Sequence, residues 1–136
     1  MTFDEAHRLV KKEEIASLRH ELDAGVSPDL SNQFSGTLLM LSTSEGDTAI
    51  GELLISRGAD TDKANDFGDT ALSLAACGGH TQFVKLLLTH GASRECRPHG
   101  TTLEDWMKVS SGLPQDKIQL VLDLISSASQ GRTDRS

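Results

Sequence analysis

Short apolar clusters recur along the chain, separated by polar links that contain glycine. The clusters Leu53–Ile55 and Leu86–Leu88 are each followed by a Gly-Ala dipeptide, at Gly58 and at Gly91. Gly25 precedes Gly58 by the same interval, a period of about 33 residues, which is within the range typical of repeat proteins. The apolar residues within a period recur at helical spacing, which predicts pairs of amphipathic helices. Because one pair cannot bury its apolar face alone, the period predicts a stack of such pairs, a solenoid.

The third period carries the most regular motif. Residues 70–75 read Thr-Ala-Leu-Ser-Leu-Ala, and a second apolar segment follows Gly79 and ends at Gly91. This string resembles the ankyrin repeat, a β-turn and two helices with a Thr-Pro-Leu-His-x-Ala signature, with Ala and Ser in place of the Pro and the His. We expect the Thr70 hydroxyl to cap the first helix, Gly79 to permit the link between the helices, and Gly91 to end the second helix.

The first two periods depart from this motif. In the second, Ser35 stands where the third has Gly68, and Ser42 and Thr43 replace two alanines. Their hydroxyls would lie in the packing layer, where each needs a partner such as the carbonyl one turn back. The first period is incomplete and rich in charged residues, as an end unit without an outer neighbour requires.

The fourth period has two alternative registers. Gly100 and Thr102 can align with the glycine and threonine of the third period, or Thr101 and Leu103 can align with its threonine and leucine. The resemblance implies an all-α ankyrin-repeat solenoid of about four helix-turn-helix units with short β-hairpin-like connecting loops and degenerate terminal units. We expect one domain at 1–125, with units at about 1–31, 32–64, 65–97 and 98–125, and a disordered tail at 126–136, which lacks the apolar residues that ordering requires.

Composition and charge narrow the choice of partners. The 136 residues include 13 Lys and Arg against 20 Asp and Glu, a net charge of −7, which argues against binding to nucleic acid or an anionic membrane. With no Tyr and one Trp, the core must consist of aliphatic helix faces. The first residues lack a signal-peptide pattern, and no apolar stretch approaches the roughly 20 residues that span a bilayer. We therefore expect a cytoplasmic protein.

The reactive side chains form no recognisable catalytic or metal-binding motif. None of the five His residues has a ligand spacing with Cys, Asp or Glu, and Gly78-Gly79 lacks the spacing of a phosphate-binding loop. Cys77 and Cys96 are expected to be reduced thiols that fill apolar space, with a redox-sensitive pair as the alternative. We expect no catalytic residue, cofactor or metal, and no enzyme activity; an enzyme hypothesis would use Ser, His and Asp residues near Pro98–Thr101.

The resemblance also implies a binding face. In ankyrin stacks the hairpin tips and the exposed side of each first helix line a concave face that holds partners. Phe34 and Phe67 occupy the same tip position in consecutive units, either as exposed anchors for a partner or as local packing against the hairpin stems. The acidic residues beside them predict a basic rim on the partner. Carried over from the family, the partner-binding residues are Gln33, Phe34, Gly36, Ser44, Glu45, Asp66, Phe67, Asp69, Cys77 and His99, with Gly78 beside them.

These features favour a non-enzymatic module, monomeric when unbound, that binds another protein. The small stand-alone stack looks like the free-standing ankyrin proteins of bacteria, some of which are thought to neutralise a toxin encoded next door. The resemblance therefore suggests an immunity or antitoxin role. The alternative is a structural adaptor or regulatory subunit in a larger assembly, with Trp106 and the C-terminal helix as a second contact.

Overall fold

The helices in the described part of the chain form four antiparallel pairs stacked side by side. The structure, a computed structural model, describes residues 2–12 and 14–135, and side chains as far as residue 127. The described residues contain no strand, and one isolated antiparallel bridge joins Ser31 to Thr37. The pairs are α1 (Phe3–Lys11) with α2 (Ile15–Asp23), α3 (Leu38–Glu45) with α4 (Thr48–Ser56), α5 (Ala71–Cys77) with α6 (Thr81–Thr89), and α7 (Leu103–Ser110) with α8 (Gln115–Arg135); a short 3-10 turn, η1 (Pro98–Gly100), precedes α7.

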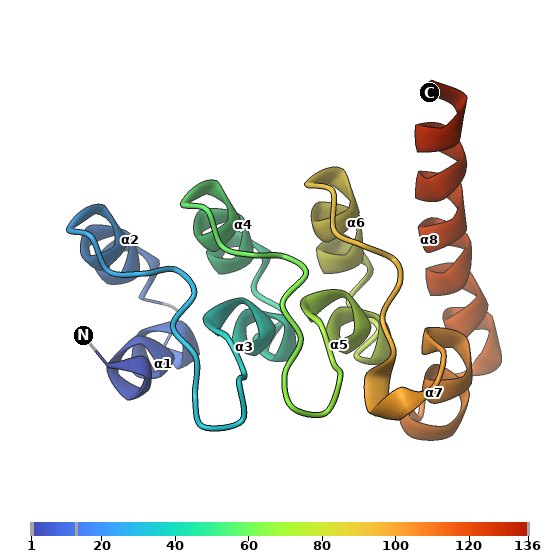
Figure 1. Cartoon of the computed structure of the whole chain (residues 1–136), viewed down its shortest axis with the longest axis horizontal. Coiled ribbons are helices and arrows are strands. Elements are labelled where there is room, and N and C mark those ends of the chain that lie inside the picture. Colours follow the sequence, from blue (N-terminus) through green and yellow to red (C-terminus); the bar gives the residue numbers. More distant parts are fainter. Residues whose placement is uncertain (1, 13, 136) are drawn as a thin grey trace.

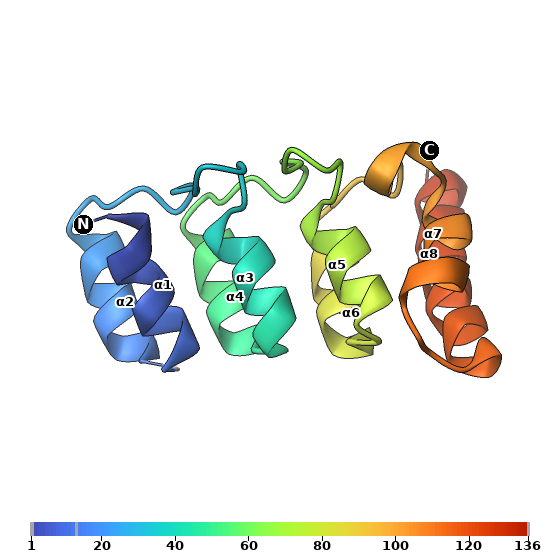
Figure 2. The same cartoon turned by 90° about the horizontal axis from the view of Figure 1, so that it is seen from below.

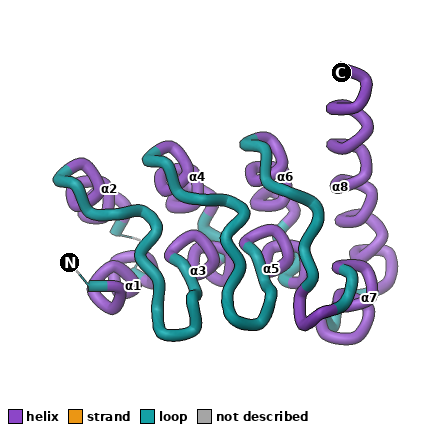
Figure 3. Tube along the Cα trace, viewed as in Figure 1, coloured by secondary structure: helices purple, strands orange, loops and turns teal. Residues whose placement is uncertain are grey.

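The helices lie in two rows. The first helices of the pairs, α1, α3, α5 and α7, form one row, and the second helices form the other (Figure 1). The three loops that connect consecutive pairs project to the same side of the stack (Figures 2 and 3). This arrangement confirms the all-α solenoid expected from the sequence.

A threonine begins the first helix of every pair. The hydroxyls of Thr2, Thr37, Thr70 and Thr102 each accept a hydrogen bond from the backbone N–H three residues further on, at 3.2–3.3 Å. Capping by Thr70 is thus confirmed, and Thr102 settles the register of the fourth unit. Gly100, two residues before Thr102, has φ +81°, as Gly68 has before Thr70. The register that pairs Thr101 with Thr70 is therefore wrong.

The other local expectations for the helix pairs are also confirmed. Gly79 links α5 to α6 with φ +70°, and Gly91 follows α6 with φ +84°. The Ser42 hydroxyl donates to the backbone carbonyl of Leu39 at 2.6 Å, and the Thr43 hydroxyl donates to that of Met40 at 2.5 Å. Both hydroxyls are fully buried, so these bonds satisfy polar groups that would otherwise destabilise the packing layer.

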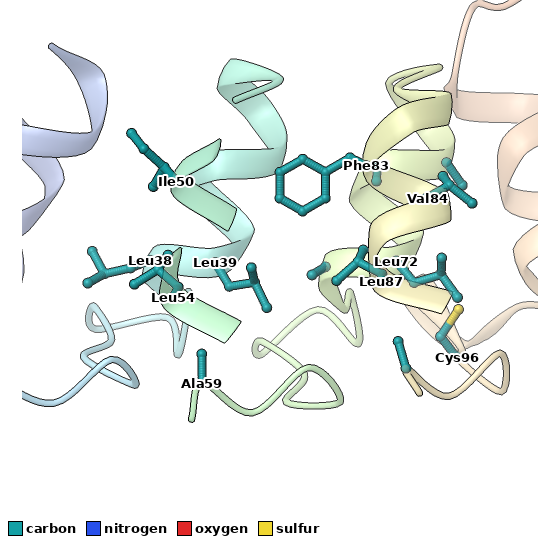
Figure 4. Packing of buried hydrophobic residues seen from close by; sticks show 14 of the residues in the cluster. Leu38, Leu39, Ile50, Leu54, Ala59, Leu72, Phe83, Val84, Leu87 and Cys96 are labelled. Atoms are coloured by element: carbon teal, nitrogen blue, oxygen red, sulfur yellow. The ribbon is translucent and has the colours of Figure 1, made fainter. Parts of the chain in front are cut away.

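The core lies between the two rows and runs continuously through all four pairs. Its largest side chain, Phe83 of α6, is fully buried and points toward α4 (Figure 4). There it contacts Gly51: a Cβ added at that glycine would lie 2.9 and 3.1 Å from Cε2 and Cε1 of the ring, and closer still to Cζ. The Phe83 ring occupies the space that a side chain at position 51 would need, which explains the glycine in the middle of α4.

Aspartates connect neighbouring units outside the core. Oδ1 of Asp29 accepts from the backbone N–H of Asp60 at 2.8 Å, and one period later Oδ1 of Asp62 accepts from the N–H of Ser93 at 2.6 Å. Each loop is thereby fixed to the loop of the next unit.

The last unit ends the stack with charges. By the register that Thr102 sets, Glu104 and Lys108 occupy the positions of Leu72 and Ala76, which are fully buried in the third unit. Their side chains form an ion pair at 2.9 Å in place of an apolar contact. Beyond them, α8 continues past residue 125 as far as Arg135. The sequence predicts a tail at 126–136; the backbone is helical over 126–135, residue 136 lies outside the described residues, and the domain boundary at 125 stays a prediction.

Candidate functional site

The hairpin tips owe their shape to an asparagine at the same position in two units. Oδ1 of Asn32 accepts two hydrogen bonds, from the backbone N–H of Phe34 at 2.9 Å and from that of Gly36 at 2.8 Å. Oδ1 of Asn65 accepts in the same way, from the backbone N–H of Phe67 at 2.9 Å and from that of Asp69 at 3.0 Å. Such Asx turns fix the tip backbone locally and place both phenylalanines at equivalent points.

Backbone hydrogen bonds join neighbouring tips. The N–H of Asp66 donates to the carbonyl of Phe34 at 2.9 Å, and the N–H of His99 donates to the carbonyl of Phe67 at 2.7 Å. In the third tip, which precedes α7, Pro98 occupies the position that Asp66 has in the second tip. Proline has no backbone N–H, so the next residue, His99, donates the hydrogen bond to the neighbouring tip. His99 is consequently the counterpart of Phe34 and Phe67.

Four rings lie in a row, an aromatic ladder formed by Phe34, Phe67 and His99 at the tips and Trp106 on α7. The centroids of Phe34 and Phe67 lie 6.2 Å apart, those of Phe67 and His99 5.8 Å apart, and those of His99 and Trp106 4.0 Å apart. Phe34 is 48% exposed and Phe67 51% exposed, whereas Trp106 is half-buried. Phe67 therefore stacks on His99, Phe34 lies against Phe67 with the two ring planes tilted by 34°, and about half of each phenylalanine remains open to solvent.

The structure corrects the place of Asp69. The sequence suggested an exposed acid at the edge of the binding face, but Asp69 is only 7% exposed. Its Oδ1 accepts from the Ser73 hydroxyl at 3.0 Å, and its Oδ2 lies 3.5 Å from Nε2 of His99. A buried carboxylate needs such partners, so Asp69 supports the start of α5 and the ladder from beneath. Asp66 and Glu45 are exposed, as expected.

Other residues expected at the binding face, from the first tip and from α3, line two adjoining hollows at the first unit. One, of about 490 Å³, includes Gln33 and Phe34, and the other, of about 160 Å³, includes Gly36 and Ser44. Both also contain Phe3, His7 and Asn32.

Phe3 and His7 were missed by sequence reasoning. They lie on α1, which has no hairpin before it in the described residues, so no periodic counterpart pointed to them. Their rings lie 5.8 Å apart, and Nε2 of His7 is buried without a hydrogen-bond partner. Trp106 was expected at a separate contact surface, whereas it stacks on His99 in the ladder.

Comparison with known proteins identifies the fold family. The family model described as ankyrin repeats (3 copies) matches residues 6–103. The chain belongs to the ankyrin repeat family. Ankyrin repeats are generally protein–protein interaction modules. A search of the curated proteins gives no match.

The two cysteines lie at the joint between the third and fourth ankyrin units, and both are free thiols. Burial raises the pKa of Cys77, partly offset by a hydrogen bond with Ser110. Burial also raises the pKa of Cys96, partly offset by a hydrogen bond with Thr70. Both side chains are therefore neutral at physiological pH. Cys77 is half-buried, so part of its uncharged side chain is open to solvent.

His99 is the titratable side chain among the rings of the ladder. His99 and Asp69 approach each other as an acid–base pair could, but within the described residues no hydroxyl or thiol is hydrogen-bonded to the His99 ring. No group of three or more His, Cys, Asp and Glu side chains in the described part of the chain is arranged to hold a metal ion. In that same part, every helix is too short or too polar to cross a bilayer.

Proposed function

We propose that this ankyrin stack binds another protein through its concave side, with the aromatic ladder as the main line of contact. The observation that carries the proposal is the half exposure of Phe34 and Phe67 in a fixed row of rings. Aromatic side chains dominate binding energy at interfaces, and a fixed row loses little entropy when a partner is bound. Gln33, Gly36, Ser44 and Glu45 would extend this contact toward the first unit.

Charge supports a partner with a basic rim. The chain carries a net charge of −7, and Asp66 and Glu45 are exposed beside the ladder and the first helices. Neither carboxylate has an ion-pair partner among the described side chains. Such charges act mainly on the association rate and on the choice of partner.

The specific form that we propose is an immunity or antitoxin role, in which the concave side occupies a toxin and blocks it. This form rests on the resemblance to small stand-alone bacterial ankyrin proteins. The test is co-expression: the product of an adjacent reading frame should arrest growth alone and should not do so together with this chain. Arrest that persists when the two proteins are made together contradicts the immunity role.

The second candidate is a structural adaptor or regulatory subunit, which needs another contact surface. Leu120 on α8 is 48% exposed and Val109 on α7 is 79% exposed. These apolar side chains could supply that surface. Trp106 does not add an independent one, because it belongs to the ladder.

The test of the contact line is the double variant Phe34→Ala with Phe67→Ala, measured by calorimetry against a partner captured from the source organism and then purified. Truncation of anchoring aromatics costs about 2 kcal/mol or more, so we expect affinity to fall about 30-fold or more. The matched control is Leu120→Ala, which removes an equally exposed apolar side chain from α8. Unchanged affinity in the double variant, or an equal loss in the control, contradicts the proposal.

A further inference from the structure

We infer that the aromatic ladder takes an extended segment of its partner that carries cationic side chains at alternate positions, over Phe34 and Phe67. This inference rests on the proposed function, because it names the chemistry of the segment that the concave side would hold. It follows from three properties of the ladder, which are the spacing of its rings, the hydrogen bonds that hold its backbone, and its charge.

The ring spacing matches an extended chain. Successive ring centroids at the three tips lie 6.2 and 5.8 Å apart. In a β-strand, alternate side chains point to the same side and lie about 6.4–6.8 Å apart, so one extended segment can place successive side chains of one face on successive rings. An α-helix advances about 6 Å over four residues, but it also turns about 40° beyond a full circle, so its third side chain leaves the line of rings.

Hydrogen bonds within and between the tips hold the backbone of the ladder. Each phenylalanine follows an asparagine that holds the tip, and the Asp66 and His99 N–H groups tie each tip to the next at 2.9 and 2.7 Å. His99 is held further by Trp106, at a centroid distance of 4.0 Å. A surface fixed in this way imposes its own spacing on a flexible partner segment.

The charge around the ladder favours cations at its first two tips. The first connecting loop, residues 24–37, contains no Lys or Arg, and the second contains four aspartates between Asp60 and Asp69 against Lys63. The third loop carries Arg94 and Arg97 against Glu95. Cations therefore suit Phe34 and Phe67 rather than His99. Arginine fits best, because its planar guanidinium stacks on an aromatic face. Asp66 belongs to the same tip as Phe67 and supplies a carboxylate there.

The probes are three synthetic peptides with the same number of arginines and the same net charge. In the first, two arginines alternate with threonine; in the second, the arginines are adjacent; in the third, they lie four apart in a helix-forming sequence. Binding to the full chain is followed by NMR titration, which detects weak complexes. We expect the alternating peptide to bind at least several-fold more tightly than the other two.

The variant Phe34→Leu with Phe67→Leu keeps the apolar surface and removes the ring faces. A cation over an exposed ring contributes about 2- to 5-fold in affinity, so the alternating peptide should lose about 5- to 30-fold with both rings gone. The adjacent-arginine peptide should change less, and Leu120→Ala should affect neither peptide.

The inference is overturned if the alternating peptide does not bind. It is also overturned if the adjacent-arginine peptide binds equally well, or if the helix-forming peptide binds more tightly. The proposed function stands if the purified protein partner still loses affinity when Phe34 and Phe67 become alanine. If the protein partner is also unaffected, both the inference and the proposed function are wrong.

Discussion

Replacement of Gly51 by alanine tests whether a single ring explains a glycine in the middle of α4. In an exposed helix this change is stabilising, by about 1 kcal/mol, because alanine is the better helix former. In this protein the added methyl would lie 2.9 and 3.1 Å from two atoms of the Phe83 ring. The ring is fully buried in the core, so α4 and α6 would have to separate.

The magnitude follows from two opposing effects. Overpacking of a close-packed core costs about 1–3 kcal/mol, and a contact this short belongs at the upper end of that range. Subtracting the gain in helix propensity, about 1 kcal/mol, leaves a loss of about 2 kcal/mol for Gly51→Ala. In a Phe83→Leu background the ring edge is absent, and the same substitution should become neutral or stabilising by up to about 1 kcal/mol.

The four proteins of this double-mutant cycle are compared by urea unfolding, followed by circular dichroism at the helix band. Fluorescence of Trp106, the single tryptophan, provides a second probe, and coincident transitions confirm that the stack unfolds as one unit. The expected interaction energy between the two sites is about 2–3 kcal/mol. If Gly51→Ala stabilises the otherwise unchanged protein, or acts equally in both backgrounds, the explanation from Phe83 is refuted.

Three further predictions concern other sites. Ser35 has φ +63°, so Ser35→Gly should relieve left-handed strain and raise stability by about 0.5–1 kcal/mol in thermal unfolding. The pKa of Cys77 and of Cys96 is raised from 9.0, so above pH 9 the unfolded chain ionises first and stability should fall as pH rises, more steeply than in a variant with both cysteines replaced by alanine. Replacing Glu104 by Leu together with Lys108 by Ala should expose an apolar end and cause concentration-dependent self-association in sedimentation, which Lys108→Ala alone should not cause.

The solenoid could be predicted from the sequence because its determinants are local and periodic. Threonine caps and glycines such as Gly79 and Gly91 act within a few residues of themselves, so their spacing reveals the helix pairs. The register of the fourth unit could not be decided in the same way. The step from Phe67 to His99 is shorter by one position than the step from Phe34 to Phe67, and only the cap at Thr102 shows which residues correspond.

The candidate site was predicted in part. The shared position of Phe34 and Phe67 is visible in the period, but the stacking of Phe67 on His99 depends on the fourth register and on Trp106, four residues beyond Thr102. The burial of Asp69 could not be predicted, because it depends on a hydroxyl of the following helix and on a ring from the next unit. Contacts between residues of different units cannot be predicted from the repeat pattern alone.

The aspartates that join the loops bear on how such a stack can change in length. Asp29 and Asp62 accept hydrogen bonds from Asp60 and Ser93, so acceptors and donors both recur once in every period. A duplicated segment of one period would therefore bring one acceptor and one donor, and would join the chain on both sides by bonds of the existing kind. A duplication that is not a whole number of periods would leave an acceptor or a donor without its partner, which favours growth and loss of the protein by whole units.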